Sequence, residues 1–199
     1  STSPLTLAEF VCGAALASLW CLCTTTRFPY VDLAVWGPHA NRILKKLRMQ
    51  ALRPNWYATW SVVELWGPPS FKVWQRCWRV SATGAEMFSI IRQSNLEIYE
   101  AHIEHFVDAY GPEAWSYIYQ ADVRMRSERS LRIREELEEK HEHYVQNGWM
   151  STFDPSRPWD AVWHEMANHE KDWWHEQVEL PGFMVLTKLK KASEYVEGD

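Results

Sequence analysis

Three histidine–glutamate pairs near the carboxyl end are the residues of this chain best suited to metal chemistry. They are His164-Glu165, His169-Glu170 and His175-Glu176. Zinc hydrolases of the His-Glu-x-x-His type place their histidines four residues apart, so that both imidazoles leave one helix face. Here the spacings are five and six, and on one continuous helix such neighbours diverge by about 120–140°. The spacing therefore predicts solvated or capping histidines rather than a shared metal ion.

Two other histidine groupings are closer together. His102 and His105 are three residues apart, a spacing that suits a transition metal if a second helix supplies further ligands. His141-x-His143 is a weaker example of the same kind. We expect both groupings to lie on solvated faces, with metal ligation as the alternative.

No motif in the chain predicts catalysis. There is no Gly-rich phosphate loop, nucleophile elbow or kinase signature, and the chain has only 8 Gly with which a backbone could approach a nucleotide. Its acidic residues form no isolated pair in an apolar setting of the sort that tunes a general acid. We therefore expect a non-enzymatic protein with no catalytic residue, no cofactor and no bound metal.

The clearest electrostatic pattern is a reversal of charge along one predicted helix. Residues 122–134 hold five Arg against two acids, whereas residues 135–143 hold five Glu against one Lys. Solvated intrahelical ion pairs would explain this pattern, each contributing a few tenths of a kcal/mol. The alternative is head-to-tail or antiparallel pairing between two copies, in which opposite ends attract. The candidate interaction residues are these arginines and three tryptophans of a later helix: Arg124, Arg126, Arg129, Arg132, Arg134, Trp159, Trp163 and Trp174.

The elements that position these residues are mostly helices. Apolar spacing and punctuation by Gly and Pro predict helices over residues 7–23, 40–47, 70–92, 94–110, 112–146, 158–179 and 183–195. Ser94-x-x-Glu97 is typical of a capping box, and Leu180-Pro181-Gly182 predicts a break before the last helix. An aromatic-Gly-Pro triplet at Trp36, Trp66 and Tyr110 is interpreted as helix-start punctuation.

The predicted helix over 112–146 is the longest, about 50 Å at 1.5 Å per residue. Its apolar stripe is thin between Arg126 and Ser130. We therefore expect its middle to be solvated or to meet a polar partner.

One β-hairpin is expected around residues 49–65. Arg53-Pro54-Asn55 is a turn cluster, and residues 56–65 are rich in Trp, Tyr, Thr and Val, which favour strands. The predicted fold is mainly α, a multi-helix bundle with this hairpin and one long helix of about 35 residues. Residues 1–147 would form a helical domain, and residues 158–199 a two-helix extension packed on the same core.

Composition limits the partners and the compartment. The chain has 199 residues, 13 of them Trp, so we expect most indole rings to build the core. Its net charge of -5 disfavours direct nucleic-acid binding, because phosphate neutralisation needs an excess of basic residues. Four Cys without zinc-site spacing predict reduced, buried thiols and an intracellular protein, cytoplasmic or nuclear.

The run of residues 10–26 carries no charge, a length that is borderline for spanning a bilayer. We expect a buried or docking helix there. Membrane contact through residues 10–26, and hence membrane association, is the alternative.

Several motifs resemble one known kind of segment. They lie at residues 35–39, 42–47, 64–69, 74–80, 118–126 and 157–159, and include Val-Trp-Gly-Pro-His, Glu-Leu-Trp-Gly-Pro-Pro and Ile-Tyr-Gln-Ala-Asp-Val-Arg. Together they resemble a Trp-rich, Gag-like segment of retroelement-type polyproteins in dinoflagellate algae, over about residues 30–199. The resemblance implies a helical particle-forming or RNA-packaging module that contacts nucleic acid only indirectly, through a separate zinc-knuckle-like stretch.

These observations lead to one expected function and one alternative. The chain is expected to be a structural module that self-associates through its helices, so that its partner is a further copy of itself. The alternative is an accessory subunit of a larger assembly, whether membrane-bound or not, docked through the apolar run of residues 10–26.

Overall fold

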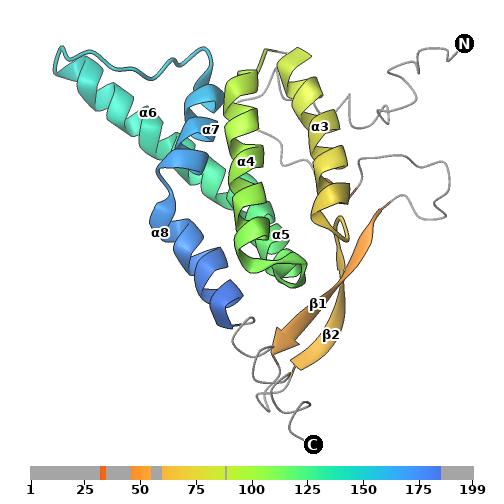
Figure 1. Ribbon diagram of the computed structural model, residues 1–199. Helices are drawn as coiled ribbons and strands as arrows, with labels where there is room; N and C mark the ends of the chain where they lie inside the picture. Colours follow the sequence, from red (N-terminus) through yellow and green to blue (C-terminus); the bar gives the residue numbers. More distant parts are fainter. Residues whose placement is uncertain (1–31, 35–45, 55–59, 88, 185–199) are drawn as a thin grey trace, which may run out of the picture.

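A computed structural model describes residues 32–34, 46–54, 60–87 and 89–184. Two strands are followed by helices, and the predicted mainly α fold with one hairpin and one long helix is confirmed (Figure 1). The predicted helices over 7–23 and 183–195, and the apolar run 10–26, lie wholly or almost wholly outside these residues. Within the described ranges, no helix combines the length and apolarity needed to cross a membrane.

Helices α3 (Phe71–Met87) and α4 (Gln93–Tyr110) lie side by side, and the long helix runs obliquely behind α4 (Figure 1). Trp74 and Trp78, four residues apart on α3, stack with ring centroids 5.3 Å apart, because this spacing puts both on one face. Helix α7 (Pro158–Asn168) packs against α4 and the long helix, and its Trp163 ring lies 5.3 Å from that of Trp78. Most of the described tryptophans are therefore core residues, in one cluster that spans α3 to α7.

The long helix runs without interruption from Pro112 to Gln146, the predicted bounds. It comprises a short 3-10 turn (Pro112–Ala114), α5 (Trp115–Arg124), a widened π-turn (Met125–Arg129) and α6 (Ser130–Gln146). It ends at Gly148, whose φ of 72° favours glycine. The N–H of Trp149 donates to the carbonyl of Tyr144, and that of Gly148 to Val145, which is the Schellman arrangement.

Of the two expectations for the middle of this helix, solvation was wrong, and contact with polar partners is confirmed. Arg126 is 4% exposed and Ser130 is 2% exposed. A charged residue in an apolar stripe usually indicates solvent, but Arg126 is buried against the carboxylate of Asp122 in the same helix. Burial of a charge is tolerated when it is paired and hydrogen-bonded.

The hairpin pairs β1 (Arg48–Pro54) with β2 (Trp60–Trp66), with Met49 opposite Leu65. Strand β1 continues through Pro54, so the turn predicted to start at Arg53 was placed too early. The end of the helix predicted over 40–47 was also wrong, because Lys46 lies in a bend and Leu47 is non-helical. Met49 and Ala51 are buried toward α5, so the hairpin rests on the helices, as marginal two-stranded sheets must.

The aromatic-Gly-Pro triplet at Trp66 precedes α3, and the one at Tyr110 precedes the long helix. Gly67 has a further role: a Cβ placed there would lie 2.3 Å from the Tyr119 ring. Only glycine allows the end of the hairpin to approach α5 this closely. The Trp36 triplet lies outside the described residues.

Two predicted helix boundaries were wrong because tertiary contacts decide them. Helix α3 ends at Met87 rather than near Arg92. Ser94 lies inside α4 and forms no side-chain cap, because the N–H of Arg92 instead donates to Oδ1 of Asp160 in α7 at 2.9 Å. The start of α4 is thus capped by another helix.

The helix predicted over 158–179 is broken, and the break predicted at Leu180 is absent. The chain leaves helical geometry at His169 and Glu170, and then resumes as α8 (Lys171–Trp174) and a second π-turn (His175–Glu179). Helical structure continues to Met184 through Pro181. A widened turn just before a proline relieves the clash of its ring with the carbonyl four residues earlier.

Candidate functional site

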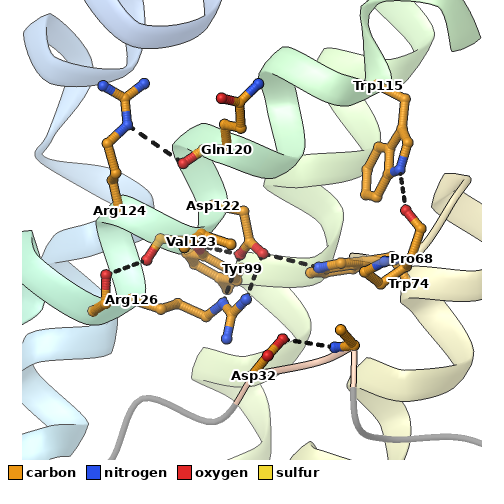
Figure 2. Close-up of polar contacts among 12 residues, drawn as sticks. Asp32, Pro68, Trp74, Tyr99, Trp115, Gln120, Asp122, Val123, Arg124 and Arg126 are labelled. Carbon is orange, nitrogen blue, oxygen red and sulfur yellow. Dashed lines mark hydrogen bonds and ion pairs between the residues drawn. The ribbon is translucent and has the colours of Figure 1, made fainter. Parts of the chain in front are cut away.

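The most chemically distinctive group of the described chain is the carboxylate of Asp122 on α5, which is fully buried (Figure 2). Its Oδ2 accepts hydrogen bonds from the indole N–H of Trp74 (3.0 Å) and from Nη2 of Arg126 (2.7 Å). Its Oδ1 accepts from the hydroxyl of Tyr99 (3.0 Å) and from Nε of Arg126 (2.8 Å). The four bonds join α3, α4 and both ends of one turn of the long helix.

This network is held by the local sequence as well as by packing. Asp122 and Arg126 are four residues apart and face the same way, and the π-turn begins between them. The hydroxyl of Ser130 donates to the carbonyl of Arg126 at 2.8 Å, and that of Ser127 to Val123 at 2.7 Å. Both serine hydroxyls thus bond carbonyls at the widened turn.

Burial is the main cause of the raised pKa of Tyr99, and the negative charge of Asp122 adds to it. The Tyr99 hydroxyl therefore stays protonated and remains a donor. Both oxygens of Asp122 are occupied, and no solvent reaches the group. In this conformation the carboxylate joins helices and offers no substrate a free oxygen.

Sequence reasoning assigned Asp122 only to the charge pattern and missed its role. A signal was present, because Asp122 follows Ile118 by four residues and so continues the apolar stripe toward Met125. A carboxylate at a stripe position with an arginine four residues later is the pattern of a buried pair.

The five candidate arginines have different surroundings. Arg126 belongs to the buried network around Asp122. Arg129 makes a bidentate ion pair with Glu170, at 2.7 and 2.8 Å, and also donates a hydrogen bond to Glu136. These hydrogen bonds raise the pKa of Arg129 above its ordinary range. Arg134 pairs with Glu138 and lies over the Trp159 ring. Arg124 and Arg132 are exposed. Arg126, Arg129 and Arg134 thus form ion pairs within the chain, and Nε of Arg124 donates to the carbonyl of Gln120 at 3.4 Å (Figure 2). A role of the arginines in pairing between copies stays a prediction.

The three candidate tryptophans are buried. Trp163 packs edge-on to Tyr99 at 4.8 Å, and the indole N–H of Trp174 donates to the carbonyl of Met166 at 2.7 Å. Trp159 is 6% exposed beneath Arg134. In this single chain, none of the three presents its ring as a surface.

The histidines of the three histidine–glutamate pairs are exposed, as predicted, but the predicted divergence of His164 and His169 was wrong. Because the chain bends at His169, the rings of His164 and His169 come within 5.4 Å of one another, although one straight helix would separate them. His169 also bonds the carboxylate of Glu165 at 2.8 Å. Among the described residues, no group of three His, Cys, Asp or Glu side chains could hold a metal ion.

His102 was expected on a solvated face, and this was wrong. Its ring packs against Phe106 (4.7 Å) and Trp174 (5.1 Å), because α8 folds back over α4. Its Nε2 has no hydrogen-bond partner in the described part of the chain. Burial lowers the pKa of His102 to about 4, and the neighbouring His105 adds to this shift. His105 is exposed, as are both His143 and the end of α6 around it.

Exposed apolar residues gather at the carboxyl end of the long helix and just beyond it. Trp149 is 58% exposed and Met150 is 96% exposed, just beyond the last turn of α6. Tyr144 packs edge-on to Trp149 at 5.8 Å, and Val145 is exposed beside them. We call Tyr144, Val145, Trp149 and Met150 the tip. The end of α6 that carries the tip projects from the bundle (Figure 1).

A pocket of about 290 Å³ lies between the start of α4, the first turns of α7 and the loop before α7. Leu137, Phe153 and Ala161 line its apolar part, and charged residues, including Arg92 and Arg157, line the rest. We call this space the α4–α7 pocket. The loop that joins the tip to α7 supplies part of its wall, so the tip and the pocket are neighbours.

No family model, curated protein or solved structure matches this chain. The resemblance to a Gag-like segment therefore depends on its motifs alone and stays a prediction. The same holds for the expected compartment and for the division at residues 147–158. Burial is confirmed for Cys77, whereas Cys12, Cys21 and Cys23 lie outside the described residues.

Proposed function

We propose that this chain is a non-enzymatic assembly module that self-associates through the tip at the end of its long helix. The observation that carries the proposal is the exposure of Trp149 and Met150 on a rigid, projecting helix end. Trp and Met are enriched in protein interfaces and depleted from ordinary surfaces. The partner is a second copy of this chain.

The tip is presented in a defined geometry, which lowers the cost of binding. The Schellman arrangement at Gly148 fixes the direction in which the chain leaves α6, and Trp149 packs on Tyr144. Side chains that are ordered before binding lose less conformational entropy in the complex. A preformed aromatic end is therefore a better contact than a loose loop of the same composition.

The interior supports the same proposal. The strongest candidate for chemistry, Asp122, is sealed among Trp74, Tyr99 and Arg126. A general base must reach its substrate within hydrogen-bond distance. The resemblance to Gag-like segments would place the proposed self-association in a particle-forming setting.

The direct test is sedimentation velocity from low to high micromolar concentration. We expect wild type to self-associate, and Trp149→Ser with Met150→Ser to weaken this at least tenfold. Met87→Ser is the matched control, because Met87 is 59% exposed on α3, away from the tip. A wild-type chain that stays monomeric throughout, or a control as weak as the tip variant, would contradict the proposal.

A further inference from the structure

The hairpin has one face on the helices and one face in solvent. Side chains alternate between the two faces along each strand, and cross-strand partners share a face. On one face, Met49 and Ala51 are buried toward α5. On the opposite face, all the side chains that the structure describes are exposed. We call this set the outer face: Arg48, Gln50, Val62, Glu64 and Trp66.

The outer face combines apolar surface with positive charge. Val62 is 64% exposed and Trp66 is 50% exposed. The guanidinium carbon of Arg48 lies 4.5 Å from the centroid of the Trp66 ring, and Nζ of Lys46 lies 5.8 Å from it. In the sequence, residues 42–53 contain five Lys or Arg and no Asp or Glu, although the whole chain has a net charge of -5. A partner that suits this face therefore presents an apolar group beside acidic residues.

The cations at the outer face remain accessible to a second carboxylate. Arg48 pairs with Glu64 at 2.9 Å and its side chain is 40% exposed, and Lys46 pairs with Asp32 at 3.2 Å and is 48% exposed. Exposed pairs of this kind contribute only about 0–1 kcal/mol, so exchanging one carboxylate for another costs little. Glu64 on the same face opposes a polyanion such as a nucleic acid, whose affinity depends on an excess of basic residues.

The tip offers the complementary combination. Its most exposed side chain, Met150, is 96% exposed. Glu138 and Glu142 precede Val145 of the tip by seven and three residues, spacings that put all three on one side of α6. Glu142 is exposed, and the side chain of Glu138 is 40% exposed. The end of α6 therefore carries an apolar group beside acidic residues, as the outer face requires.

We propose that the tip of one copy docks on the outer face of a second copy's hairpin. Met150 packs against Trp66, because a thioether makes favourable contacts with an aromatic ring. The glutamates beside the tip face Lys46 and Arg48, and these opposite charges set the orientation of the contact, with modest contributions to affinity. This inference rests on the proposed self-association and names the surface that receives the tip.

The two surfaces lie at opposite ends of the described fold (Figure 1). Each contact therefore joins two different patches, the tip of one copy and the hairpin of the next. Contacts of this heterologous kind extend an assembly head to tail, into rings or chains.

Two substitutions to aspartate separate the tip from the outer face. Met150→Asp changes the tip, and Val62→Asp changes the apolar part of the outer face, both at exposed positions. Each should weaken self-association about tenfold or more in sedimentation velocity, because an ionised carboxylate must lose hydration to enter an apolar contact. Met87→Asp, at the similarly exposed position on α3, is the matched control and should behave as wild type. Circular dichroism checks that each variant is folded.

The charge of the hairpin is tested by Arg48→Glu, which also serves as a second hairpin variant. It should weaken self-association, and the wild-type association should weaken as the salt concentration rises. Lys171→Glu, exposed at the start of α8, makes the same change in net charge and should behave as wild type.

Mixing the tip variant with a hairpin variant is the decisive measurement. The Met150→Asp copy keeps an intact outer face, and the Val62→Asp copy keeps an intact tip. Their equimolar mixture should therefore form one-to-one dimers more tightly than either variant alone. No recovery in the mixture would overturn the inference. If Met150→Asp weakens association but both hairpin variants match their controls, the proposed function stands and this receiving surface is wrong. A wild-type chain that stays monomeric would overturn both.

Discussion

The buried middle and the projecting end of the long helix both reverse the usual placement of charged and apolar residues. Around Asp122 and Arg126, an ion pair is buried inside the bundle, and both carboxylate oxygens of Asp122 accept hydrogen bonds. Around Trp149 and Met150, apolar side chains face solvent. The neighbouring helices cause this difference in burial. Helices α3, α4 and α7 surround the middle of the long helix, whereas its end extends past them (Figure 1).

This contrast shows where stability and recognition are expected to lie. Removing one partner of a buried ion pair leaves the other charge uncompensated, which is costly. Exposed side chains contribute little to the stability of the isolated chain and become important only in a complex. Substitutions in the two regions should therefore separate folding from association.

The largest effect is expected at the buried pair. Asp122→Ala strands the guanidinium of Arg126 and two further donors, and should lower the free energy of unfolding by about 3–5 kcal/mol. Urea denaturation measures this, with Glu139→Ala, exposed on the same helix, as a control that changes it by less than about 0.5 kcal/mol. Asp122→Leu combined with Arg126→Met should cost less than Asp122→Ala alone. Equal losses of unfolding free energy for Asp122→Ala and Glu139→Ala would contradict the expected difference between the buried middle and the exposed part of the helix.

Trp163 in the core and Trp149 in the tip allow the two regions to be compared with a single residue type. Trp163→Ala removes a ring packed on Trp78 and Tyr99, and should cost about 3–5 kcal/mol. Trp149→Ala should change the unfolding free energy by less than about 0.5 kcal/mol at concentrations where the chain is monomeric. Thermal and urea unfolding report both, and a large loss for Trp149→Ala would show that the tip belongs to the core.

Lowering the pH should destabilise the fold through the half-buried His102. Its pKa falls from 6.5 to about 4 on folding, so the unfolded chain binds the proton more tightly. The stability contributed by neutral His102 is therefore fully present above about pH 6.5 and is lost as pH falls toward 4. We expect a loss of about 2 kcal/mol over that window, allowing for the partial exposure of the ring. His102→Gln should remove this part of the pH dependence; an unchanged profile would contradict the prediction.

The smallest effect is expected at the ion pair between the long helix and the α7–α8 corner. Arg129 and Glu170 are partly buried and form a bidentate ion pair. A double-mutant cycle with Arg129→Ala and Glu170→Ala should give a coupling of about 1 kcal/mol. The more exposed pair Arg134–Glu138 should give about 0.3–0.5 kcal/mol. A reversed order would mean that the corner is held by packing alone.

Local signals in the sequence predicted the elements that depend on local chemistry. The bounds of the long helix follow from Pro112 and Gly148, and the hairpin follows from its β-favouring residues. The boundaries that failed lie at contacts with distant parts of the chain: Asp160 accepts from Arg92 at the start of α4, and Arg129 pairs with Glu170 at the break after α7. Propensity is a property of neighbours in sequence, and it cannot report such contacts.

What the amino-acid sequence determined by itself is therefore the mainly α fold with one hairpin and one long helix, and that most of the described indoles would be core. Tertiary structure alone decided which charges are buried, which histidine lies against Trp174, and that a recess lies beside the tip. The physical reason is that the fate of a polar or aromatic side chain depends on what packs against it. Helices brought together by their apolar faces enclose Asp122 and Arg126, and leave Met150 in solvent.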